Sequence, residues 1–121
     1  MTAEEAGERY QIPAELLSDY EQWRPAWDGE QRYGNRPYDD GDIARLSMML
    51  TLRDVGFDRD GVRQYMELFL AARNTAPERL QLLRALREQV VDDIHVRQKQ
   101  LDRLDYLRYQ IQQGKEPVLT T

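Results

Sequence analysis

The chain contains no cysteine and only one histidine, His95, among its 121 residues. The absence of cysteine excludes disulfide bonds, thiolate metal sites and cysteine nucleophiles, and a single histidine excludes any multi-histidine metal site. No motif combines a nucleophile, a base and an oxyanion-binding group. The sequence therefore predicts a protein that is not an enzyme and needs no metal or other cofactor.

Long apolar runs are also missing, and the first residues lack the charged and then apolar pattern of a secretory leader. These absences predict a soluble, cytoplasmic protein without membrane contact. With 40% hydrophobic residues in 121, the chain has enough apolar material for one modest core. We expect one domain with an appended element.

Positive charge is in deficit, because 17 Lys and Arg stand against 22 Asp and Glu. The deficit lies in residues 1–75, where 15 acidic residues and nine arginines give a net charge of −6; residues 76–121 carry +1. An acidic surface repels phosphate on average, which disfavours non-specific nucleic-acid binding. A local basic edge remains compatible with this charge.

Two short helices are predicted near the N-terminus. The first spans about residues 3–10, where Thr2 and Glu5 have the spacing of a reciprocal N-terminal cap. The second spans about residues 13–23 and has one apolar face, formed by Leu16, Leu17, Tyr20 and Trp23. The short corner between them indicates a helix-turn-helix.

Residues 24–42 contain two prolines and three glycines and show no helical period. This composition predicts an irregular loop or a small β-ribbon with its tip at residues 33–35.

Two further helices follow this loop. One is predicted from about Asp39, with Ile43, Leu46, Met49 and Leu50 facing inward, and it ends at a hinge where Gly56 can take a positive φ. The next is predicted from Asp58, with apolar residues at i, i+3, i+4 and i+7, which are Val62, Tyr65, Met66 and Phe69.

The last predicted helix is long. Thr75 and Glu78 suggest a reciprocal cap with Pro77 in the first turn, and no glycine or proline follows until Gly114. A helix of roughly 37 residues would be about 55 Å long, too long for a 75-residue domain to cover. We therefore expect a coiled-coil homodimer. Its predicted interface residues are Leu83, Leu86, Val90, Ile94, Leu101, Leu104 and Ile111.

This order of parts resembles the MerR family of bacterial transcription regulators. The segment Arg36-Pro37-Tyr38, followed by Asp42-Ile43 and Leu46, is similar to the family's R-x-Y…D-L-x-x-L run. Leu52-Arg53, Gly56-Phe57 and Val62 are similar to its LR-x-x-GF…I segment, and Leu104-Asp105-Tyr106 to the L-D-Y that closes its coiled coil.

The resemblance implies an all-α fold, or a mainly α fold with a small β-wing. Residues 1–75 would form a winged helix-turn-helix that binds double-stranded DNA, residues 76–113 a coiled-coil dimerisation helix and residues 114–121 a short tail. A homodimer would then bind a pseudo-palindromic promoter. Effector-sensing members carry a further domain after the long helix, and the tail here is too short to fold, so the sequence identifies no small-molecule effector.

The chain departs from the family pattern in the region that would touch DNA. Pro13 stands at the usual serine cap, and Ser18 and Asp19 replace an arginine and a tyrosine that would donate to phosphate oxygens. Gln11 replaces the usual corner glycine and Asn35 the tyrosine of the wing.

The family pattern nevertheless implies several DNA contacts. Arg36 matches the wing arginine, which can fork onto a phosphate, and we expect it to be exposed without packing contacts. Arg32 and Arg9 are candidate helpers. Tyr20 carries a hydroxyl that can bond a phosphate, although its position on the inner face of the second helix favours a core role. Tyr38 is expected to pack the wing against the domain.

Two functions stay open at this point. One is a MerR-like DNA-binding transcription regulator acting as a homodimer. The alternative is a degenerate MerR-like protein–protein interaction module that has lost DNA binding, which Ser18, Asp19 and the acidic charge favour.

Overall fold

The computed structural model describes residues 1–29 and 36–115, and all regular structure within them is helical. The expected all-α fold, a helix-turn-helix followed by a long C-terminal helix, is confirmed for these residues. The predicted β-wing tip at residues 33–35 lies outside them. The helices are α1 (Ala3–Tyr10), α2 (Ala14–Asp28), α3 (Asp40–Asp54), α4 (Arg59–Phe69) and α5 (Ala76–Gln112).

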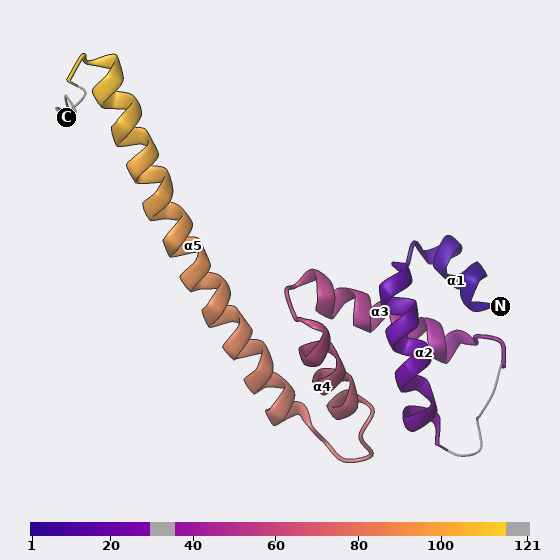
Figure 1. The fold of residues 1–121 in the computed structure, drawn as a ribbon. Coiled ribbons are helices and arrows are strands. Elements are labelled where there is room, and N and C mark those ends of the chain that lie inside the picture. Colours follow the sequence, from indigo (N-terminus) through magenta and orange to yellow (C-terminus); the bar gives the residue numbers. More distant parts are fainter. Residues whose placement is uncertain (30–35, 116–121) are drawn as a thin grey trace. The chain divides into compact units, whose positions relative to one another are not determined.

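Helices α1 to α4 form one core. Helix α1 packs on α2, α2 on α3 and α3 on α4, and α2 crosses α3 (Figure 1). Aromatic rings fill the α2 side of this core: Tyr20 meets Tyr38 edge-on, with ring centroids 5.7 Å apart. The buried apolar residues are Ala6, Ile12, Leu16, Tyr20, Trp23, Tyr38, Leu46, Met49, Leu52, Val62, Tyr65 and Met66.

The corner between α1 and α2 is tight. A Cβ added at Gly7 would lie 2.8 Å from Leu17 Cδ1, so a larger residue there would require the Leu17 side chain to move. Gln11 turns the chain in the left-handed conformation, at φ 54° and ψ 46°, which is more usual for glycine. The α1 N-cap is Thr2, whose hydroxyl accepts from the Glu5 amide at 3.1 Å.

Helix α2 is longer than the sequence predicts, because residues 24–28 are helical and not part of the loop. Pro25 lies inside the helix, where it removes one backbone hydrogen bond. Packing of the extra turn offsets this loss, since the Trp27 ring lies 5.7 Å from Trp23 and 6.1 Å from Tyr20. The end of the helix is also held by the ion pairs of Asp28, described below.

The junction from α3 to α4 follows the predicted pattern. Asp39 and Asp42 form a capping box that begins α3. At its end, Gly56 has φ 113°, and the Phe57 amide donates to the Leu52 carbonyl at 3.1 Å, which is a Schellman closure. Asp58 then caps α4 by accepting from the Gly61 amide.

The start of α5 differs from the predicted cap. Thr75 is buried, and its hydroxyl donates to the Leu68 carbonyl at 2.6 Å instead of capping α5. Glu78 pairs with Arg73, and Asn74 Oδ1 accepts from the Ala76 amide. The expected reciprocal cap is therefore wrong, because the threonine hydroxyl satisfies a carbonyl at the end of α4.

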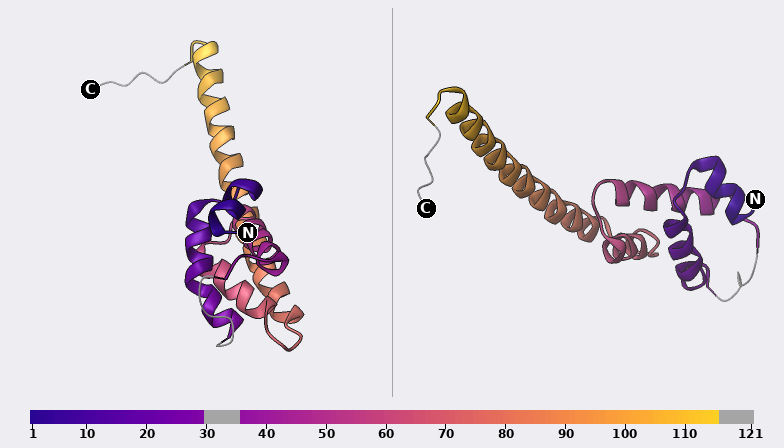
Figure 2. Two further views of the ribbon diagram at one scale, coloured as in Figure 1. Left: turned by 90° about the vertical axis from the view of Figure 1, so that its right-hand side faces the viewer. Right: turned by 45° about the horizontal axis from the view of Figure 1, so that its top comes forward.

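Helix α5 continues without interruption to Gln112, as both views in Figure 2 show. The chain divides into two compact units, Met1–Leu82 and Leu83–Thr121, and the first unit includes the first turns of α5. Among the described residues, no helix is both long enough and apolar enough to span a bilayer.

Candidate nucleic-acid interface

The helix-turn-helix formed by α1 and α2 presents one face of α2 away from the core. Leu16, Tyr20 and Trp23 bury the inner face of α2, whereas Glu15 and Ser18 are exposed and Asp19 is half-buried. In helix-turn-helix proteins the second helix enters the major groove. Its outer face is therefore the first candidate for DNA contact.

A groove of about 680 Å³ runs between this face of α2 and the α3–α4 junction. Apolar side chains, among them Leu16, Phe57 and Val62, contribute to its lining.

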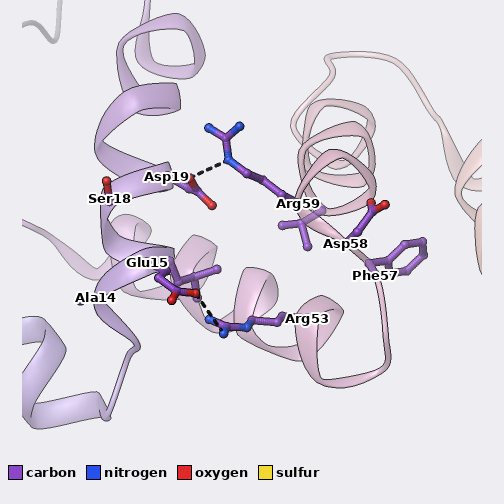
Figure 3. Close-up of a pocket in the computed structure, with 10 residues that line it drawn as sticks. Ala14, Glu15, Ser18, Asp19, Arg53, Phe57, Asp58 and Arg59 are labelled. Atoms are coloured by element: carbon purple, nitrogen blue, oxygen red, sulfur yellow. Dashed lines mark hydrogen bonds and ion pairs between the residues drawn. The ribbon is translucent and has the colours of Figure 1, made fainter.

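Two ion pairs cross the groove (Figure 3). Arg53 from α3 lies 3.4 Å from Glu15, and Arg59 from α4 donates from Nε to Asp19 Oδ1 at 2.8 Å. Both carboxylates on the outer face of α2 are thus paired with arginines from other helices.

A second group of charges lies at the other end of α2 and is largely buried. We call it the buried ion cluster; it consists of Asp28, Arg36, Asp42, Arg45 and Tyr20. The side chains of Asp28 and Asp42 are 1% exposed. Arg36 bridges them, with 2.6 Å from Nη2 to Asp28 Oδ2 and 2.6 Å from Nη1 to Asp42 Oδ2. Arg45 Nη1 lies 2.7 Å from Asp28 Oδ1, and the Tyr20 hydroxyl donates to Asp42.

The cluster determines the protonation of its members. Burial acts to raise the pKa of Asp28, but hydrogen bonds from Arg36 and Arg45 outweigh it, and the pKa lies below its usual value. Burial likewise opposes ionisation of Asp42, yet hydrogen bonds from Arg36 and Tyr20 hold its pKa well below the usual range. Burial and the hydrogen bond to Asp42 raise the pKa of Tyr20, so its hydroxyl stays protonated.

The structure describes four of the five sequence-predicted DNA contacts, and they lie in different environments. The expectation that Arg36 has no packing contact is wrong, because its side chain is only 21% exposed and joins two buried carboxylates. Tyr20 is fully buried, in line with its alternative interpretation as a core residue. Tyr38 is buried too, and its hydroxyl donates to Glu21. Arg9 is exposed at the end of α1, and Arg32 lies outside the described residues.

Sequence reasoning missed Asp28, Arg45, Arg53 and Arg59. Asp28 was assigned to the loop, so nothing suggested that it would meet Arg36 and Arg45 in the interior. Arg59 is 40 residues away from Asp19 in the chain, and no spacing rule connects them. Only the three-dimensional arrangement of α2 and α4 reveals this pair.

The predicted dimer-interface residues lie along α5. Six of them are exposed within one chain, namely Leu83, Val90, Ile94, Leu101, Leu104 and Ile111, and Leu86 is half-buried. Ile94 and Leu101 line a shallow apolar depression together with Val90. This row is the second surface with a candidate functional role.

Comparison with known proteins agrees with the helix-turn-helix. Residues 1–68 match the model of the MerR HTH family regulatory protein. An uncharacterized HTH-type transcriptional regulator of Haemophilus influenzae is 30% identical over 78 residues, which cover 64% of this chain and 58% of the relative. The chain thus spans less than two thirds of that relative, and no solved structure shows a significant match. Since the family model covers more than half of the chain, the protein belongs to the MerR family of helix-turn-helix regulatory proteins.

Proposed function

We propose that the protein is a DNA-binding transcription regulator that acts as a homodimer on a two-fold related promoter site. The observation that carries this proposal is the MerR-type helix-turn-helix built on a single core, in which Glu15, Ser18 and Gln22 on the outer face of α2 are exposed. A helix presented in this way can enter a major groove.

The α5 row supports the homodimer. Leu83, Val90, Ile94, Leu101 and Leu104 are separated by steps of three, four and seven, which is the spacing of a coiled-coil seam. Their side chains are 38% to 58% exposed within one chain, and an apolar row of this length is normally covered. A second copy of α5 offers a matching row.

Several DNA contacts remain part of the proposal. Arg9 and Arg32 stay candidate phosphate contacts, as does Arg36 through the exposed part of its side chain. Tyr20 and Tyr38 are better assigned to packing, because both side chains are buried and each hydroxyl donates to a carboxylate of the same domain.

The direct test is a gel shift of the purified chain with DNA from its own promoter, at 50 and 200 mM salt, with a scrambled fragment as the control. We expect promoter DNA to be retarded at lower protein concentration than the scrambled fragment, and both affinities to fall with salt. Equal retardation of the two fragments, or none, would contradict sequence-specific regulation.

A specific observation also favours the alternative of a protein–protein interaction module. The outer face of α2 carries the carboxylates of Glu15 and Asp19, and Arg36 is committed to the buried ion cluster. If this alternative holds, the chain will bind no promoter DNA and will instead co-purify stoichiometrically with another regulator.

A further inference from the structure

The outer face of α2 lacks a cation of its own. The one arginine in α2 is Arg24, which is 5% exposed and packs over the ring of Tyr38. The polar residues on the outer face are Glu15, Ser18, Asp19 and Gln22. Helices in a major groove lie between two rows of phosphates, which basic side chains normally contact.

Arg59 brings a cation to this face from α4. Its Nε donates to Asp19 Oδ1 at 2.8 Å, and its Nη2 donates to Gln22 Oε1 at 2.9 Å. The guanidinium also lies 5.2 Å from the centroid of the Trp23 ring. Three residues of α2 therefore fix the position of the charge. Figure 3 shows Arg59 reaching Asp19 across the groove.

The contacts with α2 position the Arg59 guanidinium without occupying all of its N–H donors. An arginine has five N–H donors, and α2 accepts from two of those on Arg59. The side chain remains 52% exposed. Donors that are fixed in direction and open to solvent suit a phosphate oxygen, because little side-chain freedom is lost on binding.

The Arg59–Asp19 pair also changes the electrostatic effect that Asp19 would have on DNA binding. A lone carboxylate on this face would repel DNA, but the adjacent guanidinium neutralises it. The second cross-groove pair is looser, since Arg53 lies 3.4 Å from a Glu15 side chain that is 84% exposed. Arg59 is therefore the better organised of the two arginines.

We propose that Arg59 of α4 contacts a DNA phosphate on behalf of α2, with Asp19 and Gln22 as positioning residues that hold its guanidinium on the outer face of the helix. This inference rests on the proposed function and adds to it a specific contact made by a residue outside the helix-turn-helix.

The test measures how the DNA affinity of the full chain depends on salt. Each lost phosphate contact lowers the slope of log K against log salt by about 0.9. We expect Arg59→Gln to lower the slope by that amount for each chain bound and to weaken binding to all sequences alike. The control is Arg73→Gln, which removes the same charge from a pair with Glu78 away from α2. It should leave the slope unchanged.

A charge swap separates the position of the charge from the identity of residue 59. The double variant Asp19→Arg with Arg59→Asp keeps a guanidinium and a carboxylate on the same face. We expect it to recover the wild-type slope and to bind within about threefold of wild type, whereas Arg59→Asp alone should bind more weakly than Arg59→Gln. Thermal unfolding of each variant verifies folding, and exposed ion pairs of this kind contribute little to stability.

The outcomes are distinct. A wild-type slope for Arg59→Gln, or a double variant as weak as the single one, would overturn the inference while the proposed function stands. A wild-type chain that binds no DNA at either salt concentration would overturn both.

Discussion

Single residues in the buried ion cluster hold the end of α2 in place. Asp28 and Asp42 are almost entirely removed from water, and each is paired with arginine. Removing one partner of a buried pair leaves an uncompensated charge, which is far more destabilising than losing an exposed ion pair.

Replacing Asp42 tests whether the loss of one buried partner destabilises the domain. We expect Asp42→Asn to lower the free energy of unfolding by about 3 kcal/mol at pH 7, measured by urea denaturation, because Arg36 loses one of its two buried carboxylates and Tyr20 loses its ionised acceptor. The matched control is Asp40→Asn on the exposed side of the same helical turn, which should change stability by less than about 0.5 kcal/mol.

The effect of Asp42→Asn should also depend on pH. The pKa of Asp42 is lower in the folded than in the unfolded chain, so the unfolded chain takes up the proton first as the pH falls. The contribution of the carboxylate is complete above about pH 5 and declines below the ordinary pKa of about 3.9. We expect the difference between wild type and variant to shrink by about 1 kcal/mol at pH 3; an equal difference at both pH values would contradict the assigned ionisation.

Gln11 offers a second test, because it occupies a left-handed conformation that disfavours side chains. We expect Gln11→Gly to raise the free energy of unfolding by about 0.5 to 1 kcal/mol. Gln64→Gly, at an exposed position inside α4, should instead lower it by about 1 kcal/mol. Urea denaturation would measure both, and a loss of stability in Gln11→Gly would argue against the φ of 54°.

Residue contacts were the part of the site least accessible from sequence. The wing-like motif identified Arg36 and Tyr38 as important, and both do meet other parts of the domain. Their partners, Asp28 and Glu21, are polar residues with no pattern of their own, so the interior role of Arg36 required the packing of α2 against α3.

Among the helices, apolar spacing, capping residues and the positions of glycine and proline predicted all five elements. Boundaries were less predictable where packing overrides local preference. Proline and glycine after Trp23 indicated a loop, but contacts of Trp27 with Tyr20 and Trp23 extend α2 beyond Pro25. The predicted cap of α5 was wrong for a similar reason, because the Thr75 hydroxyl donates to the Leu68 carbonyl.

The proline inside α2 leads to a prediction about the stability of this helix. Pro25→Ala restores an amide that can donate to the Glu21 carbonyl, and we expect it to raise the melting temperature by several degrees. Pro77→Ala is the control, because Pro77 lies in the first turn of α5, where its missing amide has no helical acceptor. A similar rise for both variants, or none for Pro25→Ala, would contradict the explanation.

For the whole molecule, the proposed homodimer makes α5 the element that sets the distance between two helix-turn-helix units. Its 37 residues correspond to about 55 Å of helix. Because the apolar row lies largely outside the first compact unit, its role cannot be packing within that unit.

Leu101→Asp tests the α5 row. Burying a carboxylate in an apolar seam is strongly unfavourable, so we expect the dimer dissociation constant to rise at least about a hundredfold in sedimentation equilibrium. Ala85→Asp adds the same group to an exposed position outside the row and should leave the association unchanged. Identical dissociation constants for the wild type and both variants would place self-association elsewhere.

The pairing of Asp28 with Arg36 has an evolutionary consequence. Losing either partner alone would leave the other charged group without this counter-ion, and the Asp28 side chain is 1% exposed. We therefore expect the two residues to be replaced together in related chains.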